Sequence, residues 1–313
     1  MSGAYPALAA RRPLILDLDG SVPPLDRGET RLPLEAWQET IRFGCSWKDY
    51  ARFASHLEAI LPEEYGCVFT GSGDFHHLSL LLLKRLQRRA ALPPACLDLV
   101  ICDNHPDTMR YLFGLHCGSW AYHAAGAACV RHVHALGLTS ADITLAHAWE
   151  NHLGPLFRGK LTYWSVGRKP AWPFRRGRGG NFPSADALIQ AFLPVLEAEG
   201  PVYLSIDKDV LHPDVARTTW DQGVFSLPHL AAVIGACAGR LAGADICGDV
   251  SGYRYAGWGK RFLSRLDGQR APDPERVLLL RERQGKVNRE LLGFFSSFAA
   301  NRPYAPAAYP YPE

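Results

Sequence analysis

Residues 97–107 read LDLVICDNHPD and residues 202–209 read VYLSIDKD, so in both places a short apolar run ends in closely spaced acidic residues. Apolar runs of this length are consistent with strands buried inside a parallel sheet. In an open parallel sheet, ligand-binding side chains gather beyond the carboxyl ends of the strands. The two stretches therefore predict an α/β fold with a polar site at one edge of its sheet.

The same alternation of short apolar runs with stretches of helical periodicity continues along the chain, as in βα units. It predicts one α/β domain over residues 1–300, followed by an extended Pro- and Tyr-rich tail over residues 301–313. The predicted strands are 13–18, 66–70, 97–102, 142–147, 160–166, 202–206, 244–247 and, late in the chain, 276–280. The predicted helices include 78–89, 118–136, 185–199 and 228–242.

Composition argues against several classes of protein. The net charge of the 313 residues is only +3, so we expect no nucleic-acid partner and no binding to an acidic membrane surface. The arginines and short apolar run of residues 11–18 lead straight into acidic residues, which favours a strand over a signal peptide. The eight cysteines are scattered singly, without CxxC pairs, which indicates reduced thiols and a cytoplasmic protein.

The two acidic stretches have the composition of a metal site. Asp103, His105 and Asp107 form a DxHxD pattern, and Asp207 with Asp209 forms DxD. Alternate residues of an extended chain point the same way, so each pattern can direct its side chains to one point. Carboxylate oxygens with some imidazole suit hard divalent ions such as Mn²⁺. Four carboxylates at one sheet edge would repel each other unless cations neutralised them, so the patterns together predict a pair of metal ions.

These motifs resemble those of the arginase family, the ureohydrolases that include arginase, agmatinase and formimidoylglutamase. Residues 103–107 are similar to the family's DAHxD motif. Residues 205–213, SIDKDVLHP, are similar to SxDxDxxDP, with His212 in place of the final aspartate, and residues 73–77, GDFHH, are similar to GGDH. The resemblance implies a three-layer α/β/α sandwich with a mostly parallel sheet of about eight strands. It also implies a homo-oligomer and two Mn²⁺ ions per chain.

The resemblance further implies a role for each metal ligand. Because the first motif is stretched here, it leaves two histidines as candidates for one position. The implied ligands are Asp103 and Asp207 as bridges between the ions, His105 and Asp209 on one ion, and Asp107 with either His76 or His77 on the other.

The implied reaction is hydrolysis of a guanidino C–N bond, which releases urea and an amine from arginine or from an arginine side chain within a peptide. Asp107 could accept a proton from the attacking water. Residues 114–118, GLHCG, resemble the family's loop with a proton-shuttling histidine, so His116, at an unperturbed pKa, could protonate the leaving amine. Family members that act on guanidinium groups typically have a glutamate where Gly248 stands here. Asp249 could supply that carboxylate if the strand end bulges.

Two alternatives remain open at this stage. Residues 16–21, LDLDGS, resemble the signature of haloacid-dehalogenase-type phosphatases, in which Asp17 would be the nucleophile and Asp19 would stand beside it. The chain could also be a metal-binding protein without catalysis. Trp120, Trp220 and the basic stretch 167–184 could shape the mouth of a pocket, although a structural or surface role is the favoured interpretation of each.

Overall fold

Nine parallel strands form the central sheet of the computed structural model, which describes residues 8–171, 179–197, 200–266 and 273–299. Within these residues the strand order is β2-β1-β4-β11-β10-β5-β7-β8-β9. The bounds are β1 Leu14–Asp17, β2 Thr30–Pro33, β4 Val68–Gly71, β5 Leu97–Cys102, β7 Val130–Leu138, β8 Leu161–Val166, β9 Gly180–Phe182, β10 Val202–Asp207 and β11 Leu241–Cys247. The short strands β3 (Gly44–Cys45) and β6 (Leu115–His116) pair with each other, antiparallel.

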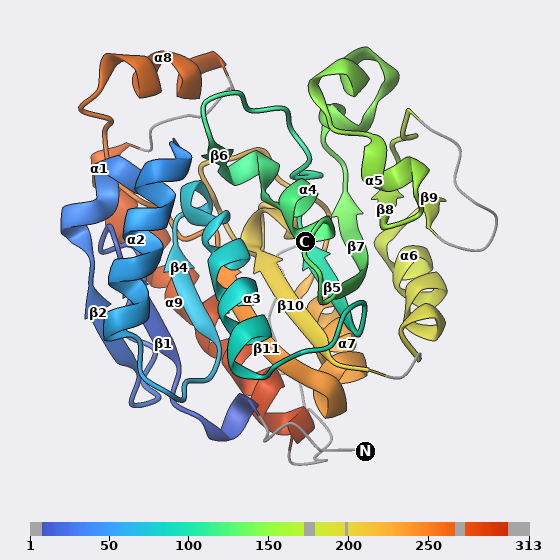
Figure 1. Cartoon of the computed structure of the whole chain (residues 1–313), viewed down its shortest axis with the longest axis horizontal. Coiled ribbons are helices and arrows are strands. Elements are labelled where there is room, and N and C mark those ends of the chain that lie inside the picture. Colours follow the sequence, from blue (N-terminus) through green and yellow to red (C-terminus); the bar gives the residue numbers. More distant parts are fainter. Residues whose placement is uncertain (1–7, 172–178, 198–199, 267–272, 300–313) are drawn as a thin grey trace.

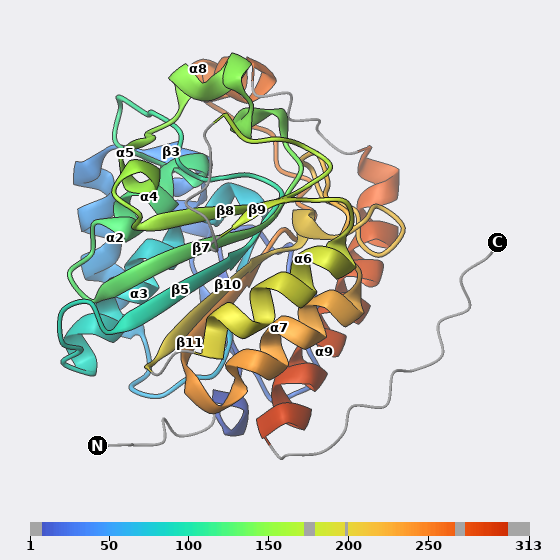
Figure 2. The same ribbon diagram turned by 90° about the vertical axis from the view of Figure 1, so that its right-hand side faces the viewer.

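Helices cover both faces of this sheet. The edge-on view shows α2, α3 and α4 on one side and α6, α7 and α9 on the other (Figure 2). Neighbouring strand residues divide between two hydrophobic cores: Ile15 packs into the core shared with α9, whereas Leu14 and Leu16 pack into the core beneath α2 and α3. The helices are α1 Gln38–Ile41, α2 Trp47–Ile60, α3 Leu78–Arg89, α4 Trp120–Ala125, α5 Gly154–Phe157, α6 Ala185–Phe192, α7 Leu227–Cys237, α8 Trp258–Leu266 and α9 Pro274–Ala299.

The three-layer sandwich predicted from the sequence is confirmed, with nine strands in the described part of the main sheet. The predicted helix 78–89 is α3, and the predicted strand 97–102 is β5. The predicted tail and the centre of the basic stretch, residues 172–178, lie outside the described residues. The last part of that stretch contributes the edge strand β9.

Three predicted elements were wrong. Residues 118–136 contain the short helix α4 and most of strand β7, because the helix ends at Gly126 and the β-branched residues that follow enter the sheet. Residues 142–147 fall mostly in the 3₁₀ helices η5 (Ala141–Ile143), which begins after the Ser140 cap, and η6 (Leu145–Glu150), which begins after Thr144. Residues 276–280 belong to α9, since a short apolar run does not distinguish a strand from a helix.

The face-on view places α8, the loop before β6 and the segment after β7 beyond the carboxyl ends of the strands (Figure 1). All eight cysteines are free thiols, and all except Cys96 are buried. Among the described residues, every helix is too short or too polar to cross a bilayer.

Candidate metal centre

The candidate site lies where four adjacent strands end. The late strands β10 and β11 are inserted between β4 and β5, so the loops after all four strands meet at one point of the sheet edge. The loop after β4 contains the 3₁₀ helix η3 (Gly73–Phe75) and then His76. Asp103 directly follows β5, and Asp207 is the last residue of β10. Chain segments that are far apart in sequence thus bring both acidic motifs together.

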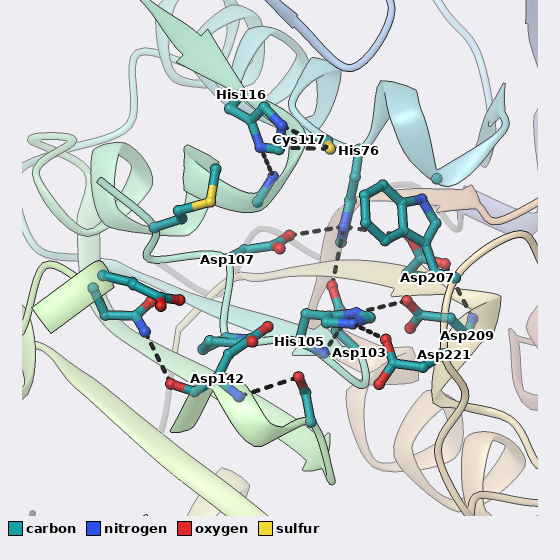
Figure 3. A pocket seen from close by; sticks show the side chains of 18 of the residues that line it. His76, Asp103, His105, Asp107, His116, Cys117, Asp142, Asp207, Asp209 and Asp221 are labelled. Atoms are coloured by element: carbon teal, nitrogen blue, oxygen red, sulfur yellow. Dashed lines mark hydrogen bonds and ion pairs between the residues drawn. The ribbon is translucent and has the colours of Figure 1, made fainter. Parts of the chain in front are cut away.

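One half of the site is centred on His76. Its Nδ1 atom lies 3.1 Å from Asp103 Oδ2 and 3.0 Å from Asp107 Oδ2 (Figure 3). Asp207 Oδ2 is 3.6 Å from the same nitrogen. All four side chains are buried. The resemblance left His76 and His77 open, and the structure brings His76 to the carboxylates.

The other half is centred on His105. Its Nδ1 atom lies 2.9 Å from Asp209 Oδ2 and 3.6 Å from Asp103 Oδ1. Asp103 therefore contributes one oxygen to each half of the site. The backbone supports this arrangement, because the amide of His105 donates to Asp103 Oδ1 and the amide of Asn104 donates to Asp209 Oδ1.

The outer nitrogen of each histidine is already engaged. His76 Nε2 lies 2.9 Å from Ser205 Oγ, and the Ser205 hydroxyl donates to Asp245 Oδ1 at 2.7 Å. Ser205 must then accept the proton of His76 Nε2. In the same way, His105 Nε2 lies 2.7 Å from Asp221 Oδ1, which can only accept when ionised. In the neutral form of each ring, the Nδ1 lone pair faces carboxylates, which is favourable only if a cation lies between them.

The charges of the cluster also indicate a cation site. Burial, reinforced by neighbouring carboxylates, raises the pKa of both Asp207 and Asp209 to about 7. Burial opposes a charge on His76, but Asp103 and Asp107 outweigh it and raise the pKa of the imidazole. The cluster therefore retains protons at neutral pH unless cations replace them.

Divalent metal ions fit this donor set. Four carboxylates and two imidazoles offer the ligands that ions such as Mn²⁺ prefer. Ligands about 2.1 Å from an octahedral ion lie about 3 Å from their neighbours, which is close to the separations around both histidines. Among the described residues, four groups of side chains have ligand atoms close enough to share an ion, and Asp103 belongs to two of these groups. These two are His76 with Asp103 and Asp107, and Asp103 with His105 and Asp209.

Asp107 is held by helix α4. The indole Nε1–H of Trp120 donates to Asp107 Oδ2 at 2.6 Å, and the amide of Ala121 donates to the Asp107 carbonyl. Asp107 itself has a positive φ of 48°, a conformation that non-glycine residues adopt at a cost. Trp120 is fully buried and therefore positions this carboxylate; it does not line the pocket.

The sequence analysis missed Asp221. This carboxylate lies on the segment between β10 and α7 and accepts from both His105 Nε2 and Asn104 Nδ2. Outer-sphere carboxylates of this kind fix the tautomer and orientation of a metal-binding histidine. No local pattern distinguishes Asp221, because its partners lie more than a hundred residues away in the sequence.

We expect Asp221→Asn to weaken Mn²⁺ binding by about 10- to 100-fold, the usual effect of removing such a partner. Asp221 is largely exposed, so the variant should fold normally. Calorimetric titration with Mn²⁺ measures the change in affinity. The control is Asp214→Asn, which alters an exposed carboxylate on the same segment. Equal affinities for Asp221→Asn and wild type would show that Asp221 does not orient His105.

The structure does not bring His77 to the carboxylates. The ring is fully buried, and burial together with the nearby His116 lowers the pKa of His77 to about 3. His116 lines the pocket, but burial and Lys260 lower its pKa to about 3 as well. The expected unperturbed pKa of His116 was therefore wrong. The Gly118 amide donates to His116 Nδ1 at 2.9 Å, which leaves the proton of the neutral ring on Nε2.

Asp249 also lies away from the pocket. Gly248 has a φ of +87°, and a Cβ atom there would lie 2.5 Å from Asp207 Oδ1. The chain turns at this glycine and directs the Asp249 carboxylate to Lys208 Nζ at 2.7 Å and to Asn288 of α9. Asp249 thus forms a buried ion pair instead of replacing the missing glutamate. A glutamate side chain would not fit at position 248 in this backbone.

The aspartates of the phosphatase alternative are engaged elsewhere. Asp17 forms an ion pair with Arg31 and accepts from the amide of Gly20. Asp19 forms an ion pair with the buried guanidinium of Arg42. Neither aspartate lines the pocket. Both instead make local contacts that stabilise the segment after β1.

The candidate metal ligands form the floor of a cavity of about 270 Å³. Beyond the ligands, the cavity is lined by His116, Trp220, Asp142, Glu150 and Asp221, and lysine and arginine are absent from the described residues that line it. The Trp220 ring contacts His105 and stacks parallel to Phe43. The cavity is therefore negatively charged even when its floor has been neutralised.

No model of a known protein family matches the chain. An uncharacterised protein of Thermotoga maritima is 30% identical over 194 residues, and this match spans 62% of both chains. Among solved structures, arginase from Bacillus subtilis superimposes with a TM-score of 0.54 at 14% identity, over 92% of this chain and 97% of that one. The chain has the arginase fold. The agmatine ureohydrolase of Thermoplasma volcanium agrees, with a TM-score of 0.51 at 13% identity, over 96% of this chain and 93% of that one.

The arginase fold confirms the architecture that the sequence motifs implied. Identities this low establish the fold alone, so the reaction rests on the geometry of this chain's own residues.

Proposed function

We propose that this protein is a manganese-dependent hydrolase with two ions per chain, which cleaves a guanidino C–N bond and releases urea and an amine. The observation that carries the proposal is the orientation of the two histidines. His76 and His105 each direct Nδ1 at carboxylates and engage Nε2 with an outer acceptor. The arginase fold and the family resemblance of the motifs support the same reaction.

Six side chains would hold the ions. When bound, two divalent ions supply a hydroxide nucleophile at neutral pH by lowering the pKa of a water molecule. The ligands would be His76, Asp103, Asp107 and Asp207 for one ion, and Asp103, His105, Asp207 and Asp209 for the other.

The remaining groups of the pocket would bind and orient the substrate. The carboxylates of Asp142 and Glu150 suit a cationic guanidinium compound, and the Trp220 ring provides an aromatic face for it. Asp107 can accept a proton, since burial raises its pKa. Neutral His116 can donate a hydrogen bond from Nε2 to the leaving nitrogen. We further propose that the protein acts in the cytoplasm, in line with its free thiols.

The experiment is a screen of Mn²⁺-loaded protein for urea release from guanidino compounds and from arginine-containing peptides, with phosphate release from phosphomonoesters assayed in parallel. Urea release that is lost on chelation supports the proposal. Phosphate release would favour the phosphatase alternative. Two bound ions with no release of either product would identify a metal-binding protein without this catalysis.

Manganese affinity should depend steeply on pH. Metal must displace protons from the cluster, and the pKa of Asp207 and of Asp209 is about 7. We expect the Kd for Mn²⁺ to rise about tenfold per displaced proton between pH 8 and pH 6, measured by calorimetry in buffers of different ionisation enthalpy.

The same shifts affect stability. Because the folded state binds these protons more tightly than the unfolded state, the metal-free protein loses stability as the pH rises towards 7. Mn²⁺ should therefore raise the Tm more at pH 8 than at pH 6. A Tm increase that is independent of pH would contradict proton displacement.

A further inference from the structure

Large apolar side chains are exposed on three segments at the end of the molecule that holds the pocket. Three pairs are exposed on separate segments: two neighbours on the loop before β6, two residues on η6 and two on α8, each of the last two pairs being four residues apart. Isolated exposed apolar residues are common, but a group around a pocket marks a binding surface. We call this group the apolar rim; it consists of Leu112, Phe113, Leu145, Trp149, Trp258 and Phe262.

Two of these segments form one wall of the pocket. Met109 pairs with Asn151 as an antiparallel bridge, and the amide of Arg110 donates to the carbonyl of Glu150 at 2.7 Å. Met109, Glu150 and Asn151 line the cavity, while Leu112 is 91% exposed just beyond it. The loop and η6 are thus joined by backbone hydrogen bonds, and their apolar side chains extend this wall outwards.

The third segment belongs to the other side of the mouth. Lys260 of α8 donates to the backbone carbonyls of Glu39, Thr40 and Arg42, which attaches the helix to the segment that precedes Phe43. Phe43 in turn stacks on Trp220 of the pocket. Figure 1 and Figure 2 both place α8 and the segment after β7 at the same end of the molecule. Trp258, 84% exposed, therefore lies on the same end as the mouth.

A small guanidino compound would occupy the cavity and leave this rim exposed to water. We infer that the rim binds a polypeptide, which inserts one cationic side chain into the pocket while its apolar neighbours cover the rim. Charge complementarity supports a cationic residue, because Asp142, Glu150 and Asp221 line the cavity in addition to the proposed metal ligands. One part of the inference rests on the proposed function, namely that the inserted cationic residue is arginine.

Binding is tested separately from chemistry with a fluorescein-labelled, acetylated and amidated pentapeptide that has one lysine between phenylalanine and leucine residues. Lysine retains the cation but has no guanidino carbon to hydrolyse. By anisotropy, we expect the Mn²⁺-loaded protein to bind it about tenfold more tightly than the same peptide with serine neighbours, a difference of roughly 1.4 kcal/mol. The double variant Phe113→Ser/Trp149→Ser should lose this difference.

Ile60→Ser is the matched control, because it removes a partly exposed apolar side chain at the end of α2, away from the rim. It should bind both peptides as the wild type does. Equal affinities for the two peptides, or unchanged binding by the double variant, would overturn the inference. Sedimentation analysis could also overturn the inference. If the wild type were an oligomer and the double variant a monomer, the rim would be a subunit interface.

The two proposals fail in different ways. If apolar neighbours strengthen peptide binding but no arginine peptide releases urea, the result supports peptide binding by the rim and contradicts the proposed reaction. The opposite result is urea release from small guanidino compounds with no effect of apolar neighbours, either on the affinity for lysine peptides or on kcat/KM for arginine peptides. That result supports the reaction and contradicts the rim inference.

Discussion

Asp103→Ala protein is expected to lose urea release by about a thousandfold or more and to bind at most one Mn²⁺ ion. Asp103 is the carboxylate that lies between the two histidines, with Oδ2 near His76 and Oδ1 near His105. A metal pair contributes several kcal/mol of transition-state stabilisation, and each 1.36 kcal/mol corresponds to a factor of ten in rate. Initial rates of urea formation and metal content by mass spectrometry measure both effects on the same sample.

Asp17→Asn is the matched control for this variant. It also neutralises a carboxylate at the carboxyl end of a strand in the same sheet, but its partners are Arg31 and the amide of Gly20. We expect wild-type urea release and metal content. If Asp17→Asn abolished activity while Asp103→Ala retained it, the active site would lie at the end of β1 and not at the end of β5.

Asp249→Ala is expected to destabilise the fold by about 3 kcal/mol or more. It leaves the Lys208 ammonium buried without its counter-ion, and unpaired buried charges are strongly destabilising. Burial already lowers the pKa of Lys208, against the opposing effect of Asp249, so loss of the carboxylate should lower that pKa further. The denaturant midpoint measures the change.

A compensated variant separates stability from catalysis. Lys208→Met/Asp249→Leu replaces the pair by apolar side chains and should recover much of the lost stability. It should retain two Mn²⁺ ions, because Lys208 points away from the site although it stands between Asp207 and Asp209 in sequence. Normal stability of Asp249→Ala together with a raised KM for guanidino substrates would instead place Asp249 in substrate binding.

The fold and the acidic motifs could be predicted because their information is local. Buried strands such as β5 and β10 appear as apolar runs, and the end of each run determines where a ligand loop begins. The alternation in DxHxD and DxD predicts that the side chains converge. In the structure, the convergence also depends on the positive φ of Asp107 and on the 3₁₀ helix η8 (Lys208–Val210), which contains Asp209.

Other features depend on contacts across the fold. Ser205 of β10 contacts Nε2 of His76, and this contact distinguishes His76 from His77 as the candidate ligand. Lys208 and the positive φ of Gly248 orient the carboxylate of Asp249. Strand β7 was missed because only residues 126–129 separate it from helix α4, and a helix-like window concealed the boundary. Asp221 and the apolar rim carry no periodic signal, since long-range packing alone determines their surroundings.

The stoichiometry of Mn²⁺ binding at pH 8 tests the central claim most directly. Calorimetric titration of the metal-free chain should give two ions per chain, with proton release on binding, and electron paramagnetic resonance should show a coupled pair of ions. The pair should disappear in His76→Ala, whereas His77→Ala, which alters the adjacent buried ring, should retain it if it folds as judged by circular dichroism. A single uncoupled ion, or a pair that persists without His76, would contradict the account.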